Sequence, residues 1–153
     1  GKMGATPETN MIDPLVALSA IASCTTSLRL GTGVNILPQA NPLLLARPAA
    51  RPDFISNGPF MLGIGIGWLA EEYRAMGVPF ERRGARFDDY VEAIQKVWTG
   101  DVVEHESEHL SWSGFKSHPL PVQDPLPLII GALLAISLAF LSMAFMPEEE
   151  RDA

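Results

Sequence analysis

The sequence predicts an α/β fold in which about three parallel strands alternate with helices and a hairpin precedes the last strand. Three short apolar runs, 28–37, 60–67 and 128–130, have the length and composition of buried strands. Segments with helical character separate these runs, and such an alternation is typical of a parallel sheet covered by helices. The chain has 153 residues, which is the length of one domain.

The first element is predicted to be a helix. Asp13 is a good N-cap residue and Pro14 suits the first helical position, and the apolar, alanine-rich stretch 15–24 follows them. Cys24, the single cysteine, is expected to be a small core residue. Because it has no partner for an internal disulfide, the chain is expected to be cytoplasmic.

A second helix is predicted to start at Asn41-Pro42, after the strand 28–37. Pro48 and Pro52 lie where this helix would continue. A proline inside a helix costs about 3 kcal/mol, so we expect this helix to be short or broken.

The second half of the chain alternates in the same way. The strand 60–67 alternates glycine with apolar residues, and a short helix is expected over 69–76. Residues 83–98 form the clearest amphipathic helix, because their apolar positions recur every three or four residues. Residues 102–116 lack a helical period and predict a hairpin, and a proline-rich connector then leads to the strand 128–130.

The hairpin contains the pattern H-E-x-x-H, with His105, Glu106 and His109. In zinc peptidases this spacing works because a helix places both histidines on one face. Neither flank continues a helix here, and in a strand the two histidines would be about 13 Å apart. We therefore predict no metal site and interpret the segment as a solvated, charged hairpin.

Charge and hydropathy narrow the function classes. The formal net charge of −7 argues against a nucleic-acid surface, which needs clustered lysine and arginine. Residues 128–146 are apolar and carry no charge, which is atypical of a helix on a soluble protein. We favour a strand followed by a buried or interface helix. A sequence altered by a frame error or gene decay is the second interpretation. A membrane span is the least favoured, because no lysine or arginine closely flanks the segment.

Three blocks of sequence, in order, resemble the bacterial-luciferase-like superfamily, above all its branch that uses the deazaflavin coenzyme F420. The blocks are 13–18 leading to 28–34, then 41–46, and finally 62–68. The third block continues with Glu71, Glu72, Tyr73, Gly77, Val78, Pro79, Phe80, Arg83 and Arg86. The resemblance implies that residues 1–153 form a single, incomplete TIM (β/α)8 barrel domain, since a complete barrel needs about 250 residues. A small doubly wound sheet is the structural alternative.

The resemblance also implies where the cofactor lies. In this family a non-proline cis peptide after one strand presses on the middle ring of the cofactor, and the matching bond here is Gly33–Val34. The alternative is that the glycines of this run merely let a helix pack closely on the strand.

The end of the strand 60–67 resembles the second cofactor contact, formed by Ile66, Gly67 and Trp68. The alternative is close strand-to-helix packing with Trp68 in the core. Gly131 stands where relatives carry a Gly-Gly pair that binds phosphate through backbone N–H groups.

The function implied by the resemblance is hydride transfer between coenzyme F420 and a small organic substrate, with an FMN-dependent monooxygenase as the alternative. The family's first strand, which supplies catalytic side chains, has no counterpart before Gly1, so we name no catalytic acid or base and expect this chain alone to be inactive. Relatives are often dimers, which leaves a homodimer open. A non-catalytic or membrane-anchored remnant is the hypothesis from another class.

Overall fold

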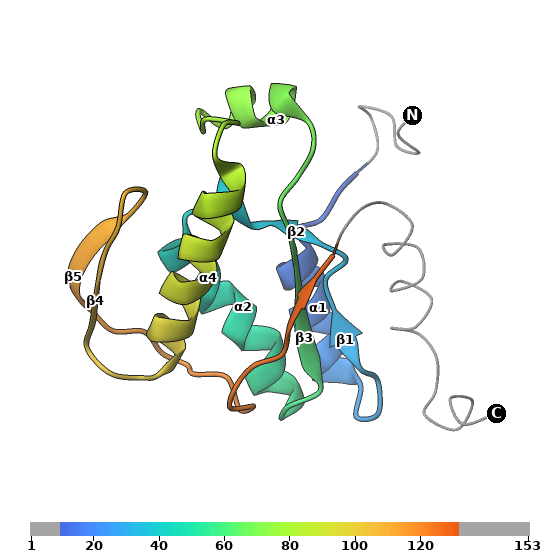
Figure 1. Ribbon diagram of the computed structural model, residues 1–153. Helices are drawn as coiled ribbons and strands as arrows, with labels where there is room; N and C mark the ends of the chain where they lie inside the picture. Colours follow the sequence, from blue (N-terminus) through green and yellow to red (C-terminus); the bar gives the residue numbers. More distant parts are fainter. Residues whose placement is uncertain (1–9, 132–153) are drawn as a thin grey trace.

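A computed structural model of the chain describes residues 10–131, and the segments 1–9 and 132–153 lie outside the described part. Its elements alternate as predicted (Figure 1). The helices are α1 (Pro14–Cys24), α2 (Pro42–Ser56), α3 (Ala70–Ala75) and α4 (Arg83–Trp98), with a short 3₁₀ helix η1 (Leu37–Gln39). The strands are β1 (Leu30–Gly31), β2 (Asn35–Ile36), β3 (Phe60–Gly65), β4 (Val103–Glu106), β5 (Ser111–Phe115) and β6 (Leu128–Ile130).

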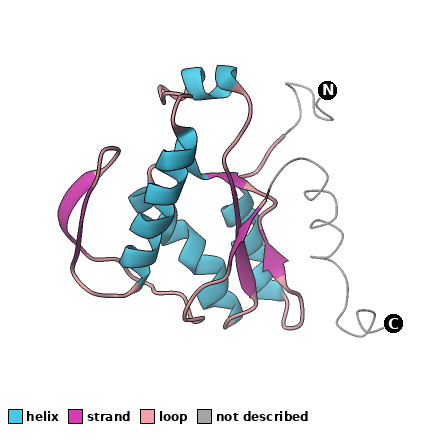
Figure 2. Ribbon diagram, viewed as in Figure 1, coloured by secondary structure: helices cyan, strands magenta, loops and turns pink. Residues whose placement is uncertain are grey.

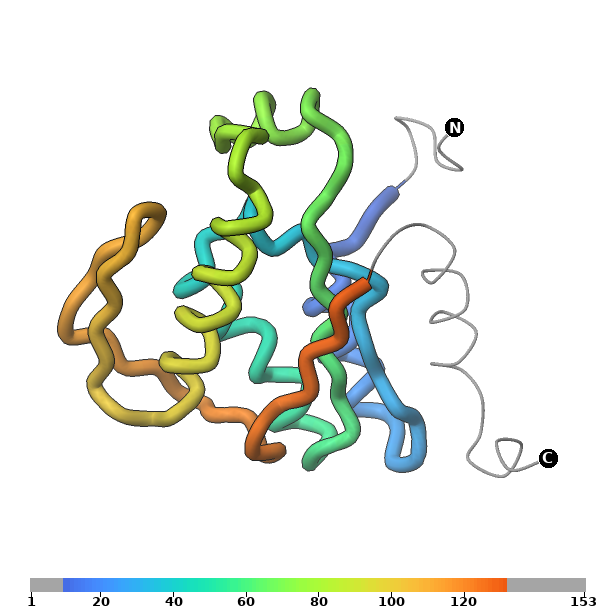
Figure 3. Tube along the Cα trace, viewed as in Figure 1, coloured from blue at the N-terminus to red at the C-terminus, as the bar shows by residue number. Residues whose placement is uncertain are grey.

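The three predicted parallel strands form one sheet with β3 in the centre. β1 and β2 both pair with β3, and β6 pairs with it as well, all in parallel. Ile64 of β3 pairs with both Asn35 of β2 and Ile130 of β6, so these two strands lie on opposite edges of β3. The tube in Figure 3 shows β6 and β3 running side by side although two helices and the hairpin separate them in sequence.

A bulge interrupts the first predicted strand. Leu30 pairs with Phe60, an offset of 30 residues, whereas Asn35 pairs with Ile64, an offset of 29. One more residue therefore lies between the two pairs on this strand than on β3, within residues 32–34. The predicted single strand is for this reason two short strands, β1 and β2.

The two faces of the sheet differ in what covers them. Phe60, Leu62 and Ile64 of β3 belong to the hydrophobic core, together with buried residues of α1, α2 and α4. Side chains alternate along a strand, so Met61, Gly63 and Gly65 face the opposite side. The face away from the helices is therefore rich in glycine near the carboxyl end of β3.

The start of α1 is confirmed, because the Asp13 side chain accepts hydrogen bonds from the backbone N–H groups of Leu15 (2.9 Å) and Val16 (3.0 Å). The expectation that Cys24 is a core residue is wrong, because its side chain is exposed. Cys24 is the last residue of α1, and the buried residues of this helix are Leu15 and Ala22.

The expectation of a short or broken second helix is wrong, because α2 continues through both Pro48 and Pro52. Asn41 caps its start, and Asn57 ends it in the left-handed conformation. Five consecutive positions of its second half, 49–53, include four buried residues, and Pro52 is one of them. Burial of these residues outweighs the proline penalty, which comes from the missing N–H donor and from the clash of the ring with the preceding turn.

The helix α4 has the predicted bounds, and the predicted hairpin is confirmed as the antiparallel pair β4–β5. Figure 2 shows the hairpin separated from the main sheet by α4. The indole Nε1 of Trp98 donates to the carbonyl oxygen of Ala46 at 3.0 Å and joins the end of α4 to α2. The hairpin therefore belongs to the outer surface and takes no part in the parallel sheet.

The solvated-hairpin interpretation is wrong for His105, which is buried against α4. Its Nε2 lies 2.6 Å from Asp89 Oδ1, and its ring stacks on Trp112 with centroids 4.7 Å apart. Its Nδ1 lies 3.3 Å from the ammonium nitrogen of Lys96. His109 lies in the hairpin turn. Within residues 10–131, no group of three or more histidine, cysteine or carboxylate side chains is placed to hold a metal ion.

Asp53 connects α2 to the segment that leads into β6. Its carboxylate is fully buried and accepts hydrogen bonds from the backbone N–H groups of Val122 (2.6 Å) and Gln123 (3.0 Å). The Gln123 side-chain amide donates both to Asp53 and to the carbonyl oxygen of Phe60. This set of bonds positions the start of β6 beside β3.

The strand predicted at the start of the apolar segment 128–146 is confirmed as β6, and residues 132–146 lie outside the described part. None of the helices that the structure describes has the length and apolar character that a membrane crossing needs.

Candidate functional site at the carboxyl edge of the sheet

The six residues predicted to contact a cofactor lie at the edge where the parallel strands end. Gly33 and Val34 lie between β1 and β2, and Gly131 follows β6. The residues 66–68 follow β3 (Figure 1). Parallel α/β sheets bind ligands at this carboxyl edge, because loops and helix ends converge there. The topology therefore gathers residues that are up to about a hundred positions apart in sequence.

The side chain of Val34 lies on the glycine-rich face of the sheet. A Cβ atom built on Gly65 would be 2.8 Å from Val34 Cγ2, and one built on Gly131 would be 2.8 Å from Val34 Cγ1. A Cβ on Gly63 would be 3.3 Å from Val34 Cγ1. The peptide bond Gly33–Val34 is cis, as the family resemblance implies.

Thr32 lies at the start of the bulge and joins it to β3. Sequence reasoning did not single it out. Its buried hydroxyl donates to the carbonyl oxygen of Gly63 at 2.8 Å, and its backbone N–H donates to Met61 at 3.3 Å. The sequence signal that could have identified it is a threonine between two glycines, Gly31 and Gly33, within an apolar run.

The segment after β3 is held against the end of β2. Gly67 has a φ of +73°, and a Cβ there would be 2.8 Å from Ile36 Cγ2 and 3.2 Å from Tyr73 Cε2. The Tyr73 hydroxyl donates to the carbonyl oxygen of Ile66. Gly67 is thus required both by its backbone conformation and by the close approach of two side chains.

Tyr73 belongs to the third block of the resemblance, where it was assigned no role of its own. Its side chain is fully buried, and its ring meets that of Phe80 edge to face at 5.3 Å. Burial raises the pKa of the Tyr73 phenol, although the nearby Arg83 and Arg86 lower it. Tyr73 therefore stays a neutral hydrogen-bond donor to the segment 66–68 at physiological pH.

The loop 66–68 presents apolar side chains outward. Ile66 is 40% exposed and Trp68 is 60% exposed. The alternative that Trp68 belongs to the core is therefore wrong, since a core tryptophan would be covered by its own fold.

The backbone N–H of Gly131 donates to the carbonyl oxygen of Ile64 at 2.9 Å. That N–H extends the sheet and is not available to a phosphate in this arrangement. The side-chain amide nitrogens of Asn35 and Gln39 are buried and have no hydrogen-bond partner among residues 10–131. They are donors close in sequence to the Gly33–Val34 bond.

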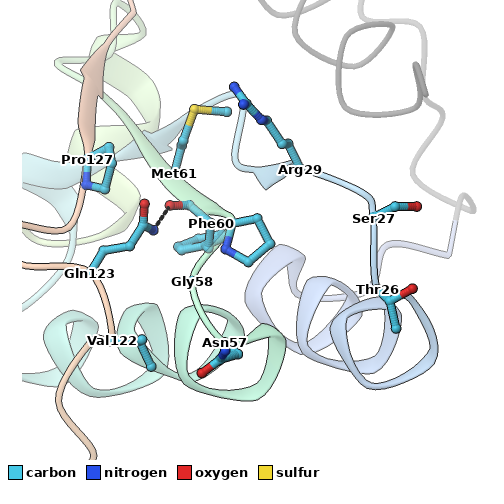
Figure 4. A pocket seen from close by; sticks show the side chains of 11 residues that line it. Thr26, Ser27, Arg29, Asn57, Gly58, Phe60, Met61, Val122, Gln123 and Pro127 are labelled. Carbon is cyan, nitrogen blue, oxygen red and sulfur yellow. Dashed lines mark hydrogen bonds between the residues drawn. The ribbon is translucent and has the colours of Figure 1, made fainter. Parts of the chain in front are cut away.

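A pocket of about 660 Å³ lies at the opposite, amino-terminal edge of the sheet (Figure 4). It is lined by residues that precede β1 and β6, among them Ser27 and Pro127, and by the start of β3 at Phe60. Ligands of barrel enzymes bind at the carboxyl edge, so this pocket does not form part of the candidate site.

A parallel sheet with this carboxyl edge is the kind of fold on which luciferase-like enzymes place their cofactor site. The family model described as luciferase-like monooxygenase matches residues 3–142, and the chain belongs to this family.

Several relatives support this assignment. An uncharacterised protein of Mycobacterium tuberculosis is 33% identical over 121 residues, which cover 79% of this chain and 43% of that protein. The oxygenase component of the flavin-dependent trigonelline monooxygenase of Acinetobacter baylyi is 36% identical over 119 residues, covering 76% of this chain and 33% of that protein. The chain thus spans less than half the length of these relatives.

Solved structures show the same fold. A monooxygenase from Streptomyces bottropensis superimposes with a TM-score of 0.72 at 32% identity, covering 77% of this chain and 36% of that one. The coenzyme F420-dependent tetrahydromethanopterin reductase of Methanopyrus kandleri superimposes with a TM-score of 0.68 at 24% identity, covering 83% and 41%. The expected α/β fold of a partial TIM barrel is confirmed by these likenesses.

Proposed function

We propose that this chain is the cofactor-holding part of a luciferase-like oxidoreductase that acts on a small organic substrate. The tricyclic ring of a flavin or deazaflavin would lie at the carboxyl edge, with Gly33–Val34 on one side and residues 66–68 beside it. The observation that carries the proposal is the convergence of these segments, in which Val34 meets Gly65 and Gly131.

The residues present fit such a ring. Trp68 and Ile66 offer exposed apolar surface, which matches the flat faces of a tricyclic ring system. The bound cofactor would supply the redox chemistry, and this chain would orient it and exclude water from its ring. No acid or base is assigned among these residues.

Coenzyme F420 is the first candidate cofactor, as the sequence resemblance implies, and FMN is the second. One specific observation favours FMN: two named relatives above 30% identity are monooxygenases, and one of them is described as flavin-dependent. The oxidoreductase class is common to both candidates, and the reaction is hydride transfer with F420 or oxygenation with FMN.

Titration of the chain with FMN and, separately, with coenzyme F420 tests the proposal. Binding should quench tryptophan fluorescence, and Trp68→Phe should remove much of that quenching. Trp112→Phe is the matched control, because Trp112 lies in the hairpin against His105 and should leave the quenching unchanged. Failure of both cofactors to bind, or equal quenching in Trp68→Phe and wild type, would contradict the proposal. The first outcome would favour the non-catalytic alternative.

A further inference from the structure

We propose that Gly63, Gly65 and Gly131 form a socket for the Val34 side chain, and that this socket sets how far the Gly33–Val34 segment projects toward the cofactor. We call these three residues the glycine socket. The inference rests on the proposed function for its cofactor, but the socket itself is a property of the sheet. Gly63 and Gly65 act as positioning residues through Val34, and Gly131 acts in the same way because its backbone N–H is bonded to Ile64.

The glycine socket is built from two strands and holds a third segment. Gly63 and Gly65 come from the central strand β3, and Gly131 comes directly after β6. All three of their missing Cβ positions lie within 3.3 Å of a methyl carbon of Val34. Real Cβ atoms essentially never approach a neighbour as closely as the 2.8 Å found at Gly65 and Gly131, so a methyl group there must displace Val34.

Glycine is an unfavourable residue in a strand, so its repetition on one face needs a physical reason. At Gly63 the reason includes the backbone, because a Cβ would lie 1.9 Å from the carbonyl oxygen of Thr32. At Gly131 the two nearest contacts of a Cβ other than backbone are Val34 atoms, at 2.8 Å and 4.0 Å. The Val34 side chain is therefore the constraint that excludes larger residues from position 131.

Val34 has little freedom to move away. Its χ1 is restricted because the side chain is branched at Cβ. The backbone on either side is fixed, since β1 and β2 both pair with β3 and the Thr32 hydroxyl is bonded to Gly63. A methyl group in the socket would therefore be expected to push residues 33–34 outward, toward the face where the cofactor ring would lie.

A double-mutant cycle in the full chain tests this inference. Gly131→Ala should weaken binding of FMN or coenzyme F420 by about tenfold or more, because it displaces Val34. Val34→Ala removes both methyl groups that fill the socket, so the Val34→Ala/Gly131→Ala variant should recover the affinity of Val34→Ala alone. Gly31→Ala is the matched control. The three atoms nearest to its Cβ would all belong to Met61, at 3.2 Å or more, so Val34→Ala should not rescue it.

The outcomes separate the socket from the proposed function. If the double variant binds as weakly as Gly131→Ala, or if Val34→Ala rescues Gly31→Ala equally well, the inference is overturned. If the wild-type chain binds neither cofactor, the proposed function fails. Thermal unfolding of the same variants then tests the socket without a cofactor. An unfolding midpoint that Gly131→Ala lowers and that the double variant restores supports the socket. A midpoint shift in the double variant equal to the sum of the two single shifts overturns it.

Discussion

Replacement of Asp53 by alanine should loosen the connection between α2 and β6 and destabilise the whole chain. Asp53 is fully buried, and its carboxylate accepts from two backbone N–H groups, those of Val122 and Gln123. Alanine removes both carboxylate oxygens: Oδ2, which accepts from these two N–H groups, and Oδ1, which accepts from the Gln123 side-chain amide. The effect should reach β6, because the segment 122–127 leads directly into this strand.

The magnitude follows from the donors left without a partner. A buried donor that loses its acceptor costs about 1–3 kcal/mol. Gln123 keeps the bond from its side-chain amide to the Phe60 carbonyl oxygen at 2.7 Å. Val122 is 47% exposed, so water can replace part of its lost bond. We therefore expect a loss of about 2–4 kcal/mol in the free energy of unfolding, out of a typical total of about 5–15 kcal/mol.

Urea unfolding followed by circular dichroism measures this loss as a lower midpoint at constant slope. Hydrogen exchange locates it, since the N–H of Leu62, which donates to Pro127, and that of Gly131 should lose protection before the rest of the sheet. Asp88→Ala, at an exposed position of α4, is the matched control and should stay within about 0.5 kcal/mol of wild type. A change as small for Asp53→Ala would refute the reasoning.

Three further predictions concern the tyrosines, Trp98 and Asp89. Burial raises the pKa values of Tyr73 and Tyr90, the chain's two tyrosines, above 10.0. Their contribution to stability is present below the unfolded pKa and is lost as pH rises through the folded pKa. Tyrosinate absorbance of the native chain should therefore develop above pH 10.0, and that of the chain unfolded in urea should develop at lower pH. Identical titrations of the native and unfolded chains would contradict this. Trp98→Phe should lower the free energy of unfolding by about 1–2 kcal/mol through its lost bond to α2, measured by urea unfolding, and an unchanged midpoint would show that the bond contributes nothing. Asp89→Asn should weaken the bond to His105 by about 1.5–3 kcal/mol and speed exchange in the hairpin amides; unchanged exchange would argue against this contact as the anchor of the hairpin.

The cofactor edge could be predicted only in part from sequence. The two glycine-rich runs indicated close backbone approach, and the resemblance placed Gly33, Val34 and residues 66–68 on the site. Thr32 and Tyr73 lie in the blocks that carry the resemblance, but sequence alone assigned them no role, because their roles depend on hydrogen bonds to Gly63 and Ile66 that connect different elements. A residue whose partner lies on another element leaves no local periodicity to detect.

Local patterns determined the order of elements in this chain. Capping by Asp13 and Asn41 marked two helix starts, and the amphipathic period of 83–98 marked α4 to the residue. Such signals are readable because they act within one or two helical turns. Family membership also came from the sequence, through the order of its three blocks.

Tertiary structure decided what those patterns could not. Packing carried α2 through Pro48 and Pro52, since burial against β3 and α4 outweighs local propensity. Packing also buried the His105 side chain beside Asp89 and left the Cys24 side chain exposed. The pairing of β3 with β2 and β6 brought Gly65 and Gly131 against Val34. These outcomes depend on contacts between residues distant in sequence, and such contacts contribute to the free energy of folding only once the sheet has formed.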